Sequence, residues 1–140
     1  MVDVAVVQRK LSQLDTYLQH VREFAAITLE EYQGDWKIQR IVESTLQMMI
    51  ETCVDIANHI VSDRGMRSPT SYADTFQVLK ENSIVDDSLH DSMVKMAKFR
   101  NIVVHQYEGV DAGIVLTILK SHLPDFERFR DVVLANIGKD

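Results

Sequence analysis

The feature that most constrains the fold is a long, regular spacing of apolar residues. One stripe advances in steps of three and four through Val4, Val7, Leu11, Leu14, Leu18, Val21 and Ala25. This spacing predicts an amphipathic helix, which we expect to end at Gly34. A second stripe runs through Ile38, Val42, Thr45, Met49, Cys53, Ile56 and Ile60. Asp35 should cap this second helix and Gly65 should end it, so the two long helices should pack antiparallel.

Further helices are expected in the second half of the chain. The segment RGMRSPTS contains Gly65 and Pro69, so it is the clearest irregular connection. Pro124 should kink or split the last helix. Alternating apolar and polar residues never persist long enough for a strand, so the sequence predicts an all-α, up-and-down bundle of about five helices in one domain over residues 1–140. The residues expected to cap the remaining helices are Ser71, Asp86 or Asp87, and Asp111.

The overall charge argues against one class of function. The formal net charge is -6 and the sequence pI is near 5.3, which disfavours a protein that coats nucleic acid through bulk electrostatic attraction. Lys95, Lys98 and Arg100 nevertheless share one expected helix, and Arg64 and Arg67 share one loop. A local basic site is therefore compatible with an acidic surface.

Two features indicate a cytoplasmic protein. A signal peptide needs a continuous apolar segment, and Asp3, Arg9 and Lys10 place charges where that segment would lie. No stretch approaches the length of a membrane span. The single cysteine, Cys53, lies in an apolar run, as expected for a buried thiol in a reducing compartment. We therefore expect a cytoplasmic location without membrane contact.

The sequence indicates no metal or cofactor site. The histidines outside the stretch described next are scattered over separate expected helices, at His20, His59, His90 and His122. There is no His-Glu-x-x-His pattern, no cysteine pair and no glycine-rich phosphate loop. A metal enzyme, a nucleoside triphosphatase and a nucleotidyltransferase are therefore not expected.

The stretch Phe99–Tyr107, FRNIVVHQY, places a charge inside an apolar helix face. On a helical wheel, Arg100 falls at the centre of an arc formed by Leu89, Met93, Met96, Val103 and Val104. A buried guanidinium without a partner is costly, so either another group meets Arg100 or this arc lines an open cleft. Glu51 and Asp55, four residues apart on the second helix, are expected to form a solvated face, and a supporting role of the two opposite Arg100 is the weaker alternative.

The polar residues of this stretch lie on two faces of the helix. Asn101 and His105 are four residues apart and share one face, where a side-chain contact is feasible. Arg100 and His105 are about 140° apart on a straight helix. They meet at one target only if the helix unwinds near His105 or if a symmetry-related chain supplies one of them. By spacing alone, a snorkelling arginine and a structural histidine are the commoner explanation.

The pattern Arg100-Asn101-x3-His105-x-Tyr107 resembles the signature of the HEPN superfamily in its HepT form. Three segments also resemble that family's helices in order, RIVESTLQMMIETCVDIANHIV, RGMRSPTSYADTFQVL and MAKFRNIVVHQY, so the resemblance extends over residues 4–135. It implies a helical ribonuclease toxin that forms homodimers with the active site in a cleft between protomers. It also implies a partner, a minimal nucleotidyltransferase antitoxin of the MntA type, that adenylylates Tyr107.

The residue types of the motif suit RNA cleavage without a metal ion. Histidine titrates near neutrality, so His105 can serve as base or acid. Arg100 stays charged and presents a fork of donors to phosphate oxygens, while Asn101 can orient His105 or bond the substrate. In a two-fold dimer, two copies of His105 could divide the base and acid roles. Further candidates for RNA contact are Arg64, Arg67 and Lys98, although solvated loop charges are the commoner explanation for Arg64 and Arg67.

Two other functions remain open. The first is a non-catalytic accessory subunit that presents substrate or nucleotide to a nucleotidyltransferase, and the second is a purely structural helical dimer. The complete set of Arg100, Asn101, His105 and Tyr107 favours the enzyme, because a scaffold has no evident need for an arginine and a histidine together beside a cleft. A gene for a small nucleotidyltransferase next to this one would support either of the first two functions.

Overall fold

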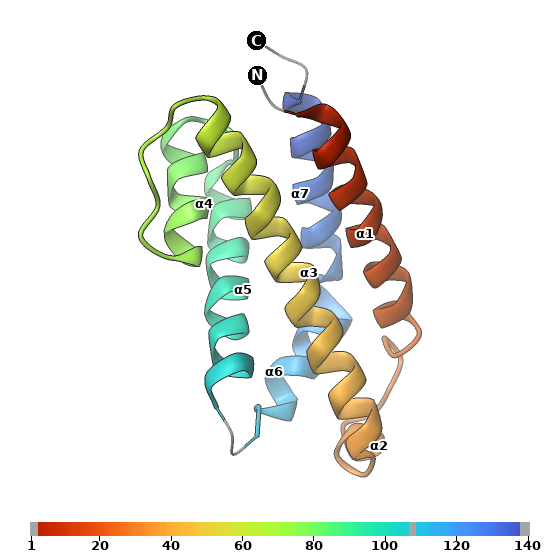
Figure 1. Ribbon diagram of the computed structural model, residues 1–140. Coiled ribbons are helices and arrows are strands. Elements are labelled where there is room, and N and C mark those ends of the chain that lie inside the picture. The colour runs from red at the N-terminus through yellow and green to blue at the C-terminus, as the bar shows by residue number, and fades with distance from the viewer. Residues whose placement is uncertain (1–2, 107–108, 138–140) are drawn as a thin grey trace.

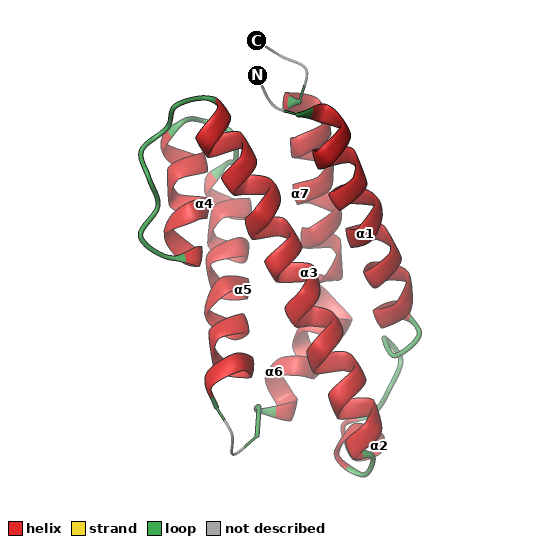
Figure 2. Ribbon diagram, viewed as in Figure 1, coloured by secondary structure: helices red, strands yellow, loops and turns green. Residues whose placement is uncertain are grey.

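The computed structural model describes residues 3–106 and 109–137, and every regular element in these ranges is helical. Figures 1 and 2 show the bundle and its connecting loops. The all-α prediction is confirmed. In chain order the elements are α1 (Val4–Arg22), α2 (Leu29–Gln33), α3 (Trp36–Asp63), α4 (Tyr72–Glu81), α5 (Asp87–His105), α6 (Ala112–Thr117), the π-helical turn η1 (Ile118–His122) and α7 (Leu123–Asn136).

The first predicted helix is interrupted. α1 ends at Arg22 rather than continuing to Gly34, and the short helix α2 begins after Thr28. The Thr28 hydroxyl accepts from the Glu31 N–H at 3.1 Å, and the Glu31 carboxylate accepts from the Thr28 N–H at 3.0 Å. The backbone and side-chain hydrogen bonds from Thr28 also lower the pKa of Glu31. This reciprocal capping box stabilises a new helix start, which explains the break.

The second predicted helix forms with the expected ends. α3 packs antiparallel to α1 (Figure 1). The Asp35 carboxylate accepts from the N–H groups of Lys37 and Ile38, which have no partner inside the helix. At the other end Gly65 has a φ of 64°, and the next N–H, that of Met66, bonds back to the helix. Glycine tolerates this left-handed conformation, so it ends α3 at little cost.

Helix α4 runs in the same direction as α3, because the connection over residues 64–71 returns along the bundle (Figure 1). This return places Tyr72, at the start of α4, beside Arg100, near the end of α5. α5 therefore runs antiparallel to both α3 and α4. Ser71 and Asp86 provide the N-caps of α4 and α5, as the sequence predicted.

The last predicted helix is split into three parts. Asp111 caps α6, and α6 passes into the π-helical turn η1 before α7 begins. Pro124 lies in the first turn of α7. Proline has no N–H to donate and clashes with the preceding turn, and a π-helical turn is one way to absorb such a mismatch within a continuous helical segment. The predicted effect of Pro124 is therefore observed.

Apolar side chains from the long helices meet in one buried core. Phe76 of α4 and Phe129 of α7 pack edge to face with ring centroids 5.8 Å apart, a favourable aromatic geometry. Cys53 is buried within α3, and this burial raises the pKa of its thiol. None of the described helices is long and apolar enough to cross a membrane.

Candidate active site

Arg100 lies on the apolar face of α5, and groups from three residues meet its guanidinium. Its Nε donates to Glu51 Oε1 of α3 at 3.4 Å, and its Nη1 donates to Asn101 Oδ1 at 3.3 Å. The ring centre of Tyr72 in α4 lies 4.5 Å from the guanidinium carbon, within cation–π distance. Partners from two neighbouring helices therefore compensate the charge that the sequence placed inside an apolar arc.

Glu51 is held by a second hydrogen bond from its own helix. Gln47 Nε2 donates at 2.7 Å to Oε1, the same oxygen that accepts from Arg100. The side chain of Arg100 is 18% exposed and that of Glu51 is 33% exposed, so the pair lies at the edge of the core and remains open to solvent. Such a partly screened pair contributes little to stability. We conclude that its main effect is to fix the direction of the guanidinium. From the sequence, a solvent-facing position of Glu51 was the preferred prediction, and a contact with Arg100 was the weaker alternative.

Asn101 and His105 are exposed on one face of the last turns of α5. The helix remains α-helical through His105, and the N–H of Gln106 donates to Ile102 O in a regular final turn. The expected alternative in which α5 unwinds near His105 is therefore wrong. Arg100 and His105 stay about 140° apart around the helix axis. One chain does not bring the two side chains to one point.

Tyr107, the residue expected to accept an adenylyl group, lies outside the described residues. The flanking structure is described on both sides. α5 ends at His105 with Gln106 as its C-cap, and Gly109 has a φ of 102°, a backbone conformation that L side chains rarely adopt. The glycine that follows the motif is thus required by the path of the chain.

Comparison with known proteins identifies the family. The family model described as Ribonuclease HepT-like matches residues 14–133. The chain belongs to this family. The HepT-like chain is 38% identical over 105 residues to the mRNA nuclease HepT of Shewanella oneidensis, a match that covers 75% of this chain and 79% of that protein. It is 26% identical over 127 residues to the tRNA nuclease HepT of Aphanizomenon flos-aquae, which covers 89% of this chain and 85% of that protein.

A solved structure supports the same assignment. The tri-AMPylated HEPN toxin of Shewanella oneidensis, in complex with an MNT antitoxin, matches with a TM-score of 0.86 and 32% sequence identity. The match covers 96% of this chain and 99% of that chain. The family and fold that the motif implied are therefore confirmed for this HepT-like chain.

Two of the basic residues expected to contact RNA, Lys98 and Arg64, lie on different parts of the fold. Lys98 is exposed on α5, close around the helix to the face that carries Asn101 and His105. Arg64 lies beyond the end of α3, where its guanidinium donates to the backbone carbonyl of Asn136 at the end of α7. The fold thus groups Lys98, but not Arg64, with the motif residues.

Arg67, the third of these basic residues, bridges two acidic residues of α4. Its guanidinium nitrogens donate to both carboxylate oxygens of Asp74 and of Glu81, each at 2.8 Å. These hydrogen bonds raise the pKa of Arg67 and hold the pKa values of both carboxyl groups below their usual range. The contact ties the connection after α3 to α4, a structural role that the sequence analysis did not recognise.

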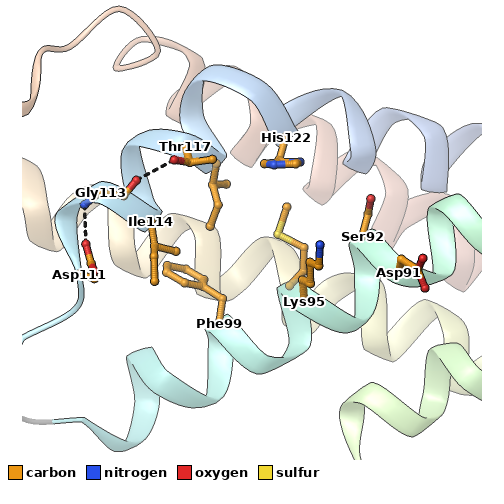
Figure 3. A pocket seen from close by; sticks show the side chains of 11 residues that line it. Asp91, Ser92, Lys95, Phe99, Asp111, Gly113, Ile114, Thr117 and His122 are labelled. Carbon is orange, nitrogen blue, oxygen red and sulfur yellow. Dashed lines mark hydrogen bonds between the residues drawn. The ribbon is translucent and has the colours of Figure 1, made fainter.

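A cavity of about 540 Å³ lies between α5 and the segment formed by α6 and η1 (Figure 3). Phe99 and Ile114 form part of its apolar wall, and Lys95 and His122 approach it from opposite sides. It opens on a different face of α5 from Arg100. The sequence analysis did not identify this cavity, because only the packing of α6 and η1 against α5 creates it.

Acidic and histidine side chains do not gather into a metal centre in the described ranges, where no group of three or more His, Cys, Asp or Glu is placed to hold an ion. Nδ1 of His122 lies 3.0 Å from Asp125 Oδ2, and Nδ1 of His90 lies 3.2 Å from Asp91 Oδ1. These two histidines therefore pair with carboxylates close to them in sequence.

Proposed function

We propose that this chain is the toxin ribonuclease of a toxin–antitoxin pair and cleaves RNA without a metal ion. Its catalytic residues are Arg100, His105 and Asn101. The observation that carries the proposal is a guanidinium fixed by Glu51 and Tyr72 on the same helix as an exposed histidine. The names of the relatives, mRNA nuclease HepT and tRNA nuclease HepT, support RNA as the substrate class.

The proposed reaction begins with attack of a ribose 2′-hydroxyl on the adjacent phosphate. His105 removes the hydroxyl proton, and a second His105, from another copy of the chain, protonates the departing 5′-oxygen. Arg100 donates to the phosphate oxygens as negative charge accumulates there. Asn101 uses its Oδ1 to accept from Arg100, which leaves its amide free to donate to substrate. The products are a 2′,3′-cyclic phosphate and a 5′-hydroxyl end.

A homodimer is part of this proposal, because one chain separates Arg100 and His105 around α5. Two exposed apolar side chains on α3 are candidates for its interface. Ile41 is 48% exposed and Met48 is 41% exposed, and they lie seven residues apart on one helix face. Burial of this apolar face against a second copy would favour association. Sedimentation that shows only a 16.0 kDa species at micromolar concentration would overturn the composite site.

We further propose that a minimal nucleotidyltransferase antitoxin controls the toxin by adenylylating Tyr107. The neighbouring structure of a tri-AMPylated HEPN toxin with an MNT antitoxin supports this partner and this modification. An adenylyl group adds a bulky phosphodiester beside the motif, where its negative charge opposes binding of RNA phosphates. We expect the pair to act in the cytoplasm, where mRNA and tRNA are found.

The decisive experiment is cleavage of total RNA in the presence of a metal chelator. We expect cleavage by the unmodified chain and none by His105→Ala. His105 is exposed, so its replacement should leave helical content and the melting temperature close to wild type. Products should carry 2′,3′-cyclic phosphate ends, which polynucleotide kinase treatment followed by ligation detects. Cleavage by His105→Ala at the wild-type rate would refute the assignment of His105.

A chain that binds its nucleotidyltransferase yet never cleaves RNA would instead be an accessory subunit. To test this alternative, the chain is prepared without a partner, and intact mass spectrometry checks that it carries no adenylyl group. Unmodified protein that leaves RNA uncut, with and without added divalent ions, would refute the ribonuclease proposal itself.

A further inference from the structure

A groove between α3 and the end of α5 has no role in the reaction described above. We name it the α3 groove. Its volume is about 420 Å³. Among its lining residues, Trp36, Arg40, Glu43 and Gln47 belong to α3, Val103 belongs to α5, and Gln106 directly follows α5. The four residues from α3 follow one another at intervals of four, three and four, so they form a single ridge along the helix.

One end of the α3 groove adjoins the pair formed by Glu51 and Arg100. Gln47 lines the groove at one end and donates to Glu51 Oε1, the oxygen that also accepts from Arg100. Trp36 lies at the other end, eleven residues away, which is about 16 Å along the helix axis. A chain-like ligand with one phosphate at Arg100 could therefore lie in this groove.

The solvent exposure of Trp36 is unusual for a tryptophan side chain. It is 66% exposed, although tryptophan buries more apolar surface than any other side chain when it is covered. The ammonium group of Lys37 lies 5.9 Å from its ring, which adds positive charge beside the indole. A wide aromatic face next to a cation is the arrangement on which single-stranded nucleic acids stack their bases.

Arg40 supplies a second cation at this end of the groove. Among the described residues it forms no ion pair, whereas Arg67, Arg128 and Arg130 are each bound to carboxylates. Glu43 is the acidic residue that lines the groove, and its carboxylate attracts Arg40 electrostatically without forming an ion pair with it. The Tyr32 hydroxyl donates to the same carboxylate at 3.4 Å. Arg40 therefore remains available for an anionic group of a ligand, such as a phosphate.

We propose that the α3 groove holds single-stranded RNA beside the cleavage site, with a base stacked on Trp36 and a backbone phosphate bound by Arg40. This inference rests on the proposed ribonuclease function. A second copy of the chain is the less fitting occupant, because Ile41 and Met48, the apolar pair suited to a dimer interface, lie about 100° around α3 from Arg40 and Gln47.

The test uses the intrinsic fluorescence of Trp36, which is the single tryptophan of the chain. The His105→Ala protein is titrated with a single-stranded RNA of twelve mixed-sequence nucleotides, so that binding is measured without cleavage. We expect saturable quenching of Trp36 fluorescence, with a midpoint equal to the Kd from fluorescence anisotropy of end-labelled RNA. Unchanged fluorescence at saturating RNA would overturn the proposal.

Variants separate stacking from charge. Trp36→Ala should weaken RNA binding by about 5-fold to 100-fold, the range expected for losing one stacked base, and Trp36→Phe should retain most of the affinity. Arg40→Gln should weaken binding and reduce the slope of log Kd against log salt by about one. Arg9→Gln removes the same charge from an exposed site on α1 and should have little effect. Equal affinities for Arg40→Gln and Arg9→Gln would contradict the phosphate contact.

Cleavage assays distinguish failure of this inference from failure of the proposed function. In the enzyme with His105 intact, Trp36→Ala should raise KM and leave kcat nearly unchanged, because the groove binds substrate and transition state alike. Normal cleavage by Trp36→Ala with an unchanged KM would refute the groove while the ribonuclease assignment stands. A shift of Trp36→Ala from dimer to monomer in sedimentation would also refute it and would assign the groove to the interface between copies.

Discussion

The guanidinium Nε of Arg100 lies 3.4 Å from Oε1 of Glu51, and this contact joins the motif helix α5 to the long helix α3. The two residues are 49 positions apart in the chain. Gln47 donates to the same oxygen at 2.7 Å, so the carboxylate is held on its own helix before it meets Arg100. The two hydrogen bonds to Glu51 therefore determine the direction of the Arg100 guanidinium.

We predict that Glu51→Gln lowers kcat by about 3-fold to 10-fold, or roughly 1 kcal/mol of transition-state stabilisation. The amide keeps the size of the side chain and an acceptor oxygen, but it loses the charge that orients Arg100. The melting temperature should change little, because partly exposed ion pairs contribute only about 0–1 kcal/mol. Steady-state cleavage of a fluorogenic RNA and thermal unfolding measure the two effects.

Asp55→Asn is the matched control for Glu51→Gln. Asp55 lies one turn further along α3, is exposed, and pairs with Lys10 of α1 at 3.5 Å rather than with Arg100. It should leave both kcat and stability close to wild type. If Asp55→Asn and Glu51→Gln lower kcat to the same extent, the loss of any one negative charge on α3 is enough to explain the effect. Glu51 would then not position Arg100.

Arg100→Lys should fold normally and lose at least about 100-fold in kcat. Lysine keeps the positive charge and can still lie over the Tyr72 ring, but it lacks the planar fork that donates to two phosphate oxygens at once. Single-turnover cleavage separates this chemical defect from RNA affinity, which should change far less. Wild-type kcat in Arg100→Lys would show that a point charge is enough.

Arg67→Gln should remove part of the acid sensitivity of the fold. The hydrogen bonds from Arg67 hold the pKa values of Asp74 and Glu81 below their usual range in the folded chain. Their stabilising effect is therefore present above the unfolded-state pKa values of about 4 and is lost as the pH falls through the lower folded values. Melting curves between pH 7 and pH 3 should be flatter for Arg67→Gln than for wild type.

The control for Arg67→Gln is again Arg9→Gln, which removes one exposed charge without touching these carboxylates. Its melting temperature should follow the wild-type pH dependence. Parallel curves for all three proteins would contradict the role of Arg67 in acid stability. RNA affinity of the same Arg67→Gln protein tests whether its guanidinium also contacts substrate.

Cys53 should be unreactive in the folded chain. It is buried in α3, and burial raises the pKa of its thiol, so little of the reactive thiolate is present or accessible at neutral pH. A colourimetric thiol reagent should report no free thiol in buffer and one per chain in denaturant, since the chain has one cysteine. Rapid reaction without denaturant would mean that the core opens locally around α3.

Tyr107→Phe should still cleave RNA but escape covalent silencing. The phenolic oxygen is the atom that would accept the adenylyl group, and none of the proposed catalytic steps uses it. Co-expression with the proposed nucleotidyltransferase antitoxin, followed by tandem mass spectrometry, should locate the modification at Tyr107 in the wild-type chain. Suppressed toxicity with an unmodified Tyr107 would instead indicate that the antitoxin silences the toxin by steric occlusion.

Four helix starts that a local hydrogen bond sets agree with the prediction from sequence. Asp35, Ser71, Asp86 and Asp111 each cap a helix at the expected position. A capping side chain bonds to a backbone N–H within the next three residues, so neighbouring residues in the sequence contain the information. The break before Thr28 was missed although its capping box is also local, because the apolar stripe of α1 was extended past it to Gly34.

The sequence by itself determined an all-helical chain, the position of most helix ends, and the family motif that unites Arg100, Asn101 and His105 on one helix. These features depend on periodicity and on contacts within a turn. The tertiary structure decided that α4 runs parallel to α3, that Glu51 and Tyr72 hold Arg100, and that a groove extends from Trp36 to Gln47, the residue that donates to Glu51. Such contacts join residues far apart in the chain, and they depend on which helix faces pack together, which no local pattern specifies.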